Sequence, residues 1–98
     1  MVLCITGDVC MDKPEFLALL KERGFPDPVL VEYPANKGLD IHTHNFEALA
    51  LIIEGSMTIT TDGVRSNYSV GDIFHLKYQQ PHEESYGLHG VKYLAGRK

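Results

Sequence analysis

Apolar and polar residues alternate in short stretches over most of the chain, a pattern typical of β-strands. The first such stretch covers residues 29–33, and a longer apolar one covers residues 48–53 and ends at Glu54-Gly55. Asp62-Gly63 separates two further β-rich stretches, and this dipeptide is a strong marker of a tight hairpin turn. Strands and turns at intervals of about eight to twelve residues are typical of small barrels and sandwiches. The pattern therefore predicts an all-β domain.

The N-terminal part differs, because residues 12–24 carry the signals of one amphipathic helix. Asp12 can cap the helix, Pro14 fits its first turn, and Glu15 completes a capping box. Gly24 suits the position just after the helix end. The residues of the apolar face are Phe16, Leu17, Leu19 and Leu20. We expect residues 1–29 to form a short strand, near residues 2–5, and this helix, both packed on a barrel of residues 30–98.

Length and charge exclude several classes of protein. Ninety-eight residues make one domain, and the net charge is −4, with no basic cluster longer than Arg97-Lys98. Nucleic acid is therefore not an expected partner. No apolar stretch approaches the roughly 20 residues that span a bilayer, and the first residues lack the features of a signal peptide. We expect a cytoplasmic protein in which Cys4 and Cys10 are ordinary side chains.

The candidate chemistry of this chain lies in its histidines. His42 and His44 are two residues apart, and on an extended strand such side chains project from one face, about 7 Å apart along the backbone. A transition metal about 2.0–2.1 Å from each imidazole nitrogen can then be held by both rings. The alternative is a pair of exposed histidines near a turn. The residues that follow favour the metal site.

His42 and His44 belong to one of two segments with regularly spaced glycines, acidic residues and histidines. The matching positions are Gly38, His42, His44 and Gly55 in the first segment, and Gly71, Asp72, Pro81 and His82 in the second. These segments resemble the two motifs of the cupin superfamily. The C-terminal sequence is similar to that of small single-domain, RmlC-like cupins of the cupin-2 type, which end in His-x-Glu, a glycine-rich hairpin and a basic tail. The resemblance covers residues 30–98.

The resemblance implies a fold and a metal site. The fold is the double-stranded β-helix, or jelly-roll barrel, here with one N-terminal α-helix. The site is a divalent metal held by His42, His44 and His82. Members of this type are mostly uncharacterised, so the resemblance implies no particular reaction.

Two positions depart from the cupin motifs. The metal-binding glutamate of the first motif falls at Ala48, and Glu47 is one residue out of phase. A shift of one residue moves a side chain to the opposite face of a strand. Glu47 is therefore a fourth ligand only if the loop after His44 turns it inward, and we favour a loop or solvent role for it. The Pro-x-Gly of the second motif is replaced by Lys77-Tyr78-Gln79.

The expected ligands suggest a range of metals and two functions. Three imidazoles leave open positions on a metal, as in catalytic sites. They favour zinc, copper, iron or nickel, and a carboxylate from Glu47 or Glu84 would make iron or manganese more plausible. One function is a metal-binding protein for a small organic molecule, which could be an enzyme of dioxygenase, isomerase or lyase type. The alternative is a non-catalytic ligand-binding or sensor module without a functional metal.

The remaining histidines and tyrosines are weaker candidates for the site. His75 faces either the interior or the solvent, and His89, which lies between glycines, is expected to be exposed. Tyr78, Tyr86 and Tyr93 are expected to be packing residues, because tyrosine suits half-buried strands.

We also expect a homodimer. A barrel of about seventy residues has limited room for a core, and the predicted strand near residues 2–5 has no local partner. Proteins usually pair or cover such a strand. Its exchange across a two-fold axis would pair it in both subunits.

Overall fold

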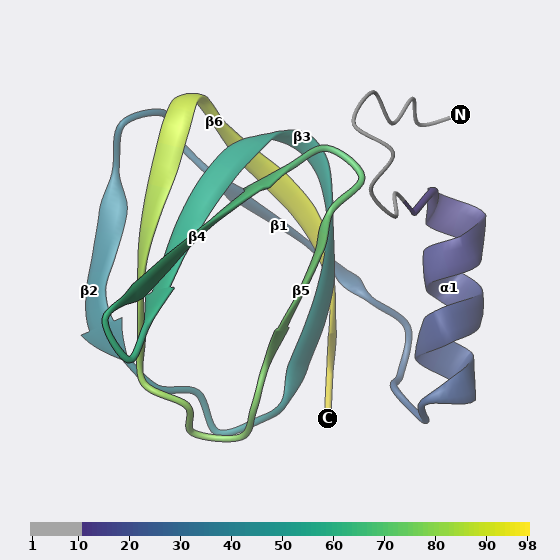
Figure 1. Cartoon of the computed structure of the whole chain (residues 1–98). Coiled ribbons are helices and arrows are strands. Elements are labelled where there is room, and N and C mark those ends of the chain that lie inside the picture. The colour runs from purple at the N-terminus through teal and green to yellow at the C-terminus, as the bar shows by residue number, and fades with distance from the viewer. Residues whose placement is uncertain (1–10) are drawn as a thin grey trace.

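A computed structural model describes residues 11–98 of the chain. These residues form one helix, α1 (Lys13–Glu22), and six strands: β1 (Val29–Tyr33), β2 (Gly38–His42), β3 (Ala48–Thr61), β4 (Val64–Ser69), β5 (Ile73–Leu76) and β6 (His82–Arg97). The strands curl into a barrel with α1 on its outside (Figure 1). The predicted all-β class with one N-terminal helix is confirmed. The predicted strand near residues 2–5, Cys4 and Cys10 lie outside the described residues.

The two longest strands, β3 and β6, form the centre of the sheet and pair antiparallel along most of their length. At the His82 end of β6, β2 pairs with β6 and β4 pairs with β3. At the other end, β1 pairs with β6 and β5 pairs with β3. β3 and β6 thus belong to two layers that wrap around one interior. This is the expected jelly-roll arrangement.

Both long strands bend where Gly55 of β3 meets Gly90 of β6. The two glycines have positive φ angles of 72° and 71°, and a Cβ atom on Gly55 would lie 2.0 Å from the Gly90 carbonyl oxygen. The register between the strands also shifts on both sides of Gly55. The sequence predicted a turn at Glu54-Gly55 and a hairpin in the glycine-rich C-terminal segment. Both predictions are wrong, because the strands continue to pair beyond their glycines.

The Asp62-Gly63 hairpin and the helix agree with the sequence prediction. Asp62 and Gly63 have φ angles of 50° and 77°, as a tight type I′ turn requires. Asp12 caps α1, and its side chain accepts a hydrogen bond of 3.0 Å from the Glu15 backbone nitrogen. Gly24, with φ 75°, follows the helix end. Among residues 11–98, no helix is long and apolar enough to cross a membrane.

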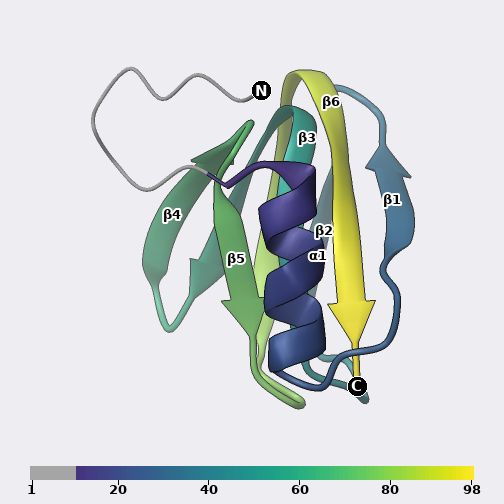
Figure 2. The same ribbon diagram turned by 90° about the vertical axis from the view of Figure 1, so that its right-hand side faces the viewer.

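The described residues pack into two hydrophobic cores, one inside the barrel and one outside it. The inner core includes Ala50, Ile52, Phe74, Val91 and Tyr93. The outer core lies between α1 and the outer face of β3 (Figure 2) and contains Phe16, Leu20, Phe25, Leu49 and Leu51. Helix α1 therefore covers one outer face of the barrel. The division of the chain at residue 29 into an N-terminal part and a barrel stays a prediction.

Candidate metal centre

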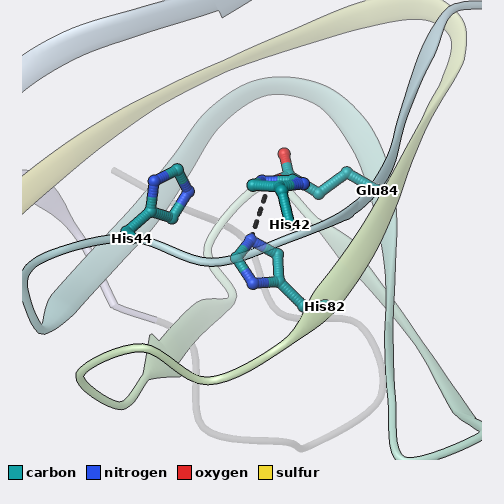
Figure 3. Close-up of side chains that lie close together, drawn as sticks. All are labelled: His42, His44, His82 and Glu84. Atoms are coloured by element: carbon teal, nitrogen blue, oxygen red, sulfur yellow. Dashed lines mark hydrogen bonds and ion pairs between the residues drawn. The ribbon is translucent and has the colours of Figure 1, made fainter.

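Three histidines meet inside the barrel where β2 and β6 pair (Figure 3). His42 ends β2, His44 lies in the loop just after it, and His82 begins β6 directly opposite His42. The ring centre of His42 lies 4.2 Å from that of His82 and 4.9 Å from that of His44. The structure thus brings together the three histidines that the sequence singled out.

The carboxylate beside these histidines belongs to Glu84. Side chains alternate between the two faces of a strand, so Glu84 points to the same side of β6 as His82. One candidate ligand atom from each of the four residues lies within 4.8 Å of the others. Glu84 Oε2 is 3.0 Å from His82 Nε2 and 3.2 Å from His42 Nε2. The cluster therefore has the composition of three imidazoles and one carboxylate.

The cluster is closed on the β6 side and open on the β2 side. The side chains of His82 and Glu84 are 1% and 5% exposed, whereas that of His42 is 24% exposed. His44 is also partly exposed. A molecule that reaches the cluster from solvent must therefore approach past His42 and His44.

Glu47, the fourth ligand considered from the sequence, lies away from this cluster. Ala48 packs in the inner core, and Glu47, one residue earlier, lies on the outer face with its carboxylate bonded to His75. His75 faces outward because it lies between the buried Phe74 and Leu76. The hydrogen bond with His75 lowers the pKa of Glu47 below its ordinary value of 4.5. Glu47 thus carries its charge on the outside of the barrel.

Backbone carbonyls orient two of the imidazoles. The Nδ1–H of His42 donates to the Asp40 carbonyl at 2.7 Å, and that of His82 donates to the Gln80 carbonyl at 2.9 Å. A carbonyl can only accept, so each Nδ1 carries a proton, and in the neutral form of each ring Nε2 presents its lone pair to the cluster. Metal-binding histidines characteristically donate their second ring nitrogen in this way.

One of these Nε2 atoms has no hydrogen-bond partner. His42 Nε2 is buried and makes no hydrogen bond to any described residue; its 3.2 Å contact with Glu84 Oε2 does not have the geometry of one. An unpaired buried polar atom is costly. The donor set and this orphaned nitrogen both fit a bound transition metal.

His44 is held neutral and in place. Burial lowers its pKa below the ordinary 6.5, and the imidazoles of His42 and His82 lower it further, against the opposite effect of Glu84. The ring stacks on Phe46, with centres 4.9 Å apart. A neutral imidazole is the form that binds a metal, so His44 is ready to act as a ligand near neutral pH.

The loop that departs from the cupin motif supports His44. Gln79 takes the place of the motif's glycine and has a φ angle of 55°, in the left-handed region that glycine prefers. Its backbone nitrogen donates to the His44 carbonyl at 2.9 Å. The Gln79 amide and the Tyr78 hydroxyl both donate to Asn45 Oδ1, at 3.3 and 3.0 Å. The altered loop therefore binds the segment that carries His44.

Tyr86 makes a polar contact that the sequence did not predict. It packs in the inner core as predicted, but its hydroxyl also donates to Glu84 Oε1 at 3.1 Å. Burial and the neighbouring Glu84 raise the pKa of Tyr86 well above its ordinary range, so the hydroxyl keeps its proton. The available signal was the two-residue period of His82, Glu84 and Tyr86 along β6.

Aromatic side chains fill most of the space beside the cluster. The remaining cavity has a volume of about 30 Å³, and its walls include Tyr33, His44, Phe46, Glu84, Tyr93 and Arg97. This is room for about one water molecule. A larger molecule would fit only at the open side of the cluster, unless the aromatic side chains moved.

Comparisons with known proteins identify the fold. No protein-family model and no curated protein matches this sequence. Among solved structures, an RmlC-like cupin from Shewanella frigidimarina matches 71% of this chain and 63% of its own, with 18% identity and a TM-score of 0.61. A cupin superfamily protein from Desulfitobacterium hafniense matches 67% of this chain and 60% of its own, with 20% identity and a TM-score of 0.59.

A third similar structure carries the name of an enzyme. The DMSP lyase DddQ from Ruegeria pomeroyi matches 70% of this chain but 36% of its own, with 20% identity and a TM-score of 0.64. The match covers less than two thirds of each of these three proteins. Because one fold hosts many activities, similarity at this level identifies the architecture alone. The chain has the fold of a small cupin domain.

Proposed function

We propose that this chain is a metal-binding cupin domain in which His42, His44, His82 and Glu84 hold one divalent transition metal beside a small organic molecule. The main support is the position of Glu84 Oε2 between two imidazole nitrogens, at 3.0 and 3.2 Å. All three atoms carry lone pairs when the rings are neutral and the carboxylate is charged. Such atoms repel unless they share a proton or a metal ion, and a metal ion would bind all of them at once.

The ligand set limits the metal and its chemistry. Three imidazoles suit zinc, copper, nickel and iron, and the carboxylate adds manganese. A metal held there would act as a Lewis acid or activate a bound water. The carbonyls of Asp40 and Gln80 keep the lone pairs of His42 and His82 directed at the site. The closed β6 side shields the site from solvent, and the open β2 side admits the small molecule.

A second function is a ligand-binding or sensor module without a functional metal. It is favoured by one observation, the hydrogen bonds that Glu84 makes within the protein to His82 and Tyr86. A proton between Glu84 and His82 would satisfy both groups without a metal. The cytoplasmic location and the homodimer stay predictions from the sequence.

Metal loading distinguishes the two functions. Protein stripped with a chelator and dialysed against Mn²⁺, Co²⁺, Ni²⁺ or Zn²⁺ should retain about one equivalent per chain by elemental analysis. The double variant His42→Ala, His44→Ala should retain none. A wild-type protein without bound metal, or a double variant that keeps it, would contradict the metal site.

A matched pair of carboxylate variants tests the fourth ligand. Glu84→Gln should weaken metal binding by at least about tenfold, because it removes the charge beside the histidines. Glu47→Gln should leave metal affinity unchanged, because Glu47 bonds to His75 on the outer face. The reverse order of effects would show that Glu47 is the ligand and that Glu84 is not.

A further inference from the structure

Tyr86 is a buried polar residue beside the metal site to which the proposed function assigns no role. It is 6% exposed, and its hydroxyl lies 3.1 Å from Glu84 Oε1. Its ring is stacked on Tyr33, with centres 4.5 Å apart and planes within 5°. The stacked ring limits rotation of Tyr86, so the hydroxyl is directed at one oxygen of Glu84.

The two oxygens of Glu84 have different surroundings. Oε2 faces the imidazoles of His42 and His82, at 3.2 and 3.0 Å, whereas Oε1 receives the Tyr86 hydroxyl. Turning Oε1 toward the histidines would break this hydrogen bond. The buried hydroxyl would then lose its partner, which is unfavourable. The packing of Tyr86 therefore favours one orientation of the carboxylate.

We propose that Tyr86 is a positioning residue that occupies Oε1 of Glu84, so that the carboxylate offers only Oε2 to the metal. This inference rests on the metal site proposed above. A carboxylate that binds through one oxygen takes one position on the metal and leaves another for water or a small molecule. Hydrogen bonds to a ligating carboxylate are also a recognised means of tuning metal affinity.

The variant Tyr86→Phe tests this role, because it removes the hydroxyl and keeps the ring. We expect metal affinity, measured by competition with a chelator, to fall about 10- to 100-fold. Tyr68→Phe is the matched control, since Tyr68 packs on Phe74 and is not bonded to Glu84; its affinity should equal that of the wild type. The visible absorption of bound Co²⁺ should also change in Tyr86→Phe alone, because the freed oxygen can join the coordination shell.

A double-mutant cycle separates positioning from a general effect on the fold. In a Glu84→Ala background, adding Tyr86→Phe should cause no further loss of affinity, because the hydroxyl acts only through Glu84.

If Tyr86→Phe does not fold, the variant Tyr33→Leu takes its place. It keeps the Tyr86 hydroxyl but removes the stacked ring, and we expect metal affinity to fall about three- to tenfold.

Each outcome bears on one of the two proposals. Wild-type protein that binds no metal would overturn the metal site and this inference together. Wild-type binding with unchanged affinity and an unchanged Co²⁺ spectrum in Tyr86→Phe would overturn this inference alone. The inference would also be overturned if Tyr86→Phe lowered metal affinity equally with and without Glu84. If Tyr86→Phe does not fold, an unchanged metal affinity in Tyr33→Leu would overturn it.

Discussion

The two halves of β6, on either side of Gly90, both pair with β3 but differ in the residues that point into the barrel. Before the bend at Gly90 the inward side chains are His82, Glu84 and Tyr86, and after it they are Val91, Tyr93 and Ala95. Both halves show the same two-residue alternation. The two-residue period of the strand therefore decides which residues face inward. The chemical nature of those residues decides whether a half of β6 forms the candidate site or the hydrophobic core.

The outer faces of the two halves differ as well. In the first half, Glu83 and Ser85 point outward and are exposed. In the second half, Gly96 lies under α1, where a Cβ atom would come within 2.6 Å of Leu20. The second half is thus covered on both faces in this region, whereas the first is covered on one. We infer that the second half contributes more to stability and that the first forms the site.

The largest expected effect comes from removing the bend that separates the halves. Gly55→Ala should lower the free energy of unfolding by about 3 kcal/mol or more, because the new Cβ would clash with the Gly90 carbonyl. Urea denaturation measures this loss. Gly63→Ala is the control, since it has a positive φ of similar size but no atom within 4 Å of the added Cβ. Equal losses of unfolding free energy in both variants would show that the clash with the Gly90 carbonyl does not cause the loss in Gly55→Ala.

A pair of variants, one in the apolar second half of β6 and one in the histidine cluster beside the first half, should separate stability from metal binding. Val91→Ala removes two buried methyl groups and should cost about 2 kcal/mol of unfolding free energy, with metal stoichiometry unchanged. His42→Ala, opposite the first half, should abolish metal binding and change the stability of the metal-free protein by less than about 1 kcal/mol. Thermal melts and elemental analysis on the same samples check both. If fully folded Val91→Ala protein lost its metal, this would contradict the separation of β6 into a half that forms the core and a half that forms the site.

The smallest expected effect concerns the loop that supports His44. Gln79→Gly should stabilise the metal-free protein by up to about 1 kcal/mol, because glycine adopts the left-handed conformation without strain. The same change removes the side-chain bond to Asn45, so metal affinity should fall slightly while stability rises. Calorimetry of unfolding and of metal binding tests whether stability and metal affinity change in opposite directions. A decrease in stability would show that the Asn45 bond outweighs the backbone strain.

The sequence by itself determined the elements whose signals act within a few residues. The capping box at Asp12 and Glu15 marks the start of α1, and Asp62-Gly63 marks the hairpin. The spacing of His42 and His44 also indicated a shared site, because residues two apart in an extended segment face one side. Each of these inferences needs only local backbone geometry.

The tertiary structure alone decided the features that depend on distant partners. A glycine allows either a turn or a bend, and the pairing of β3 with β6 makes Gly55 and Gly90 bends. Glu47 is closer to the histidine pair in sequence, yet the phase of β3 places it outside, whereas β6 places Glu84 beside the histidines. Pairing between strands far apart in the chain sets which carboxylate reaches the site, and no local pattern contains that information.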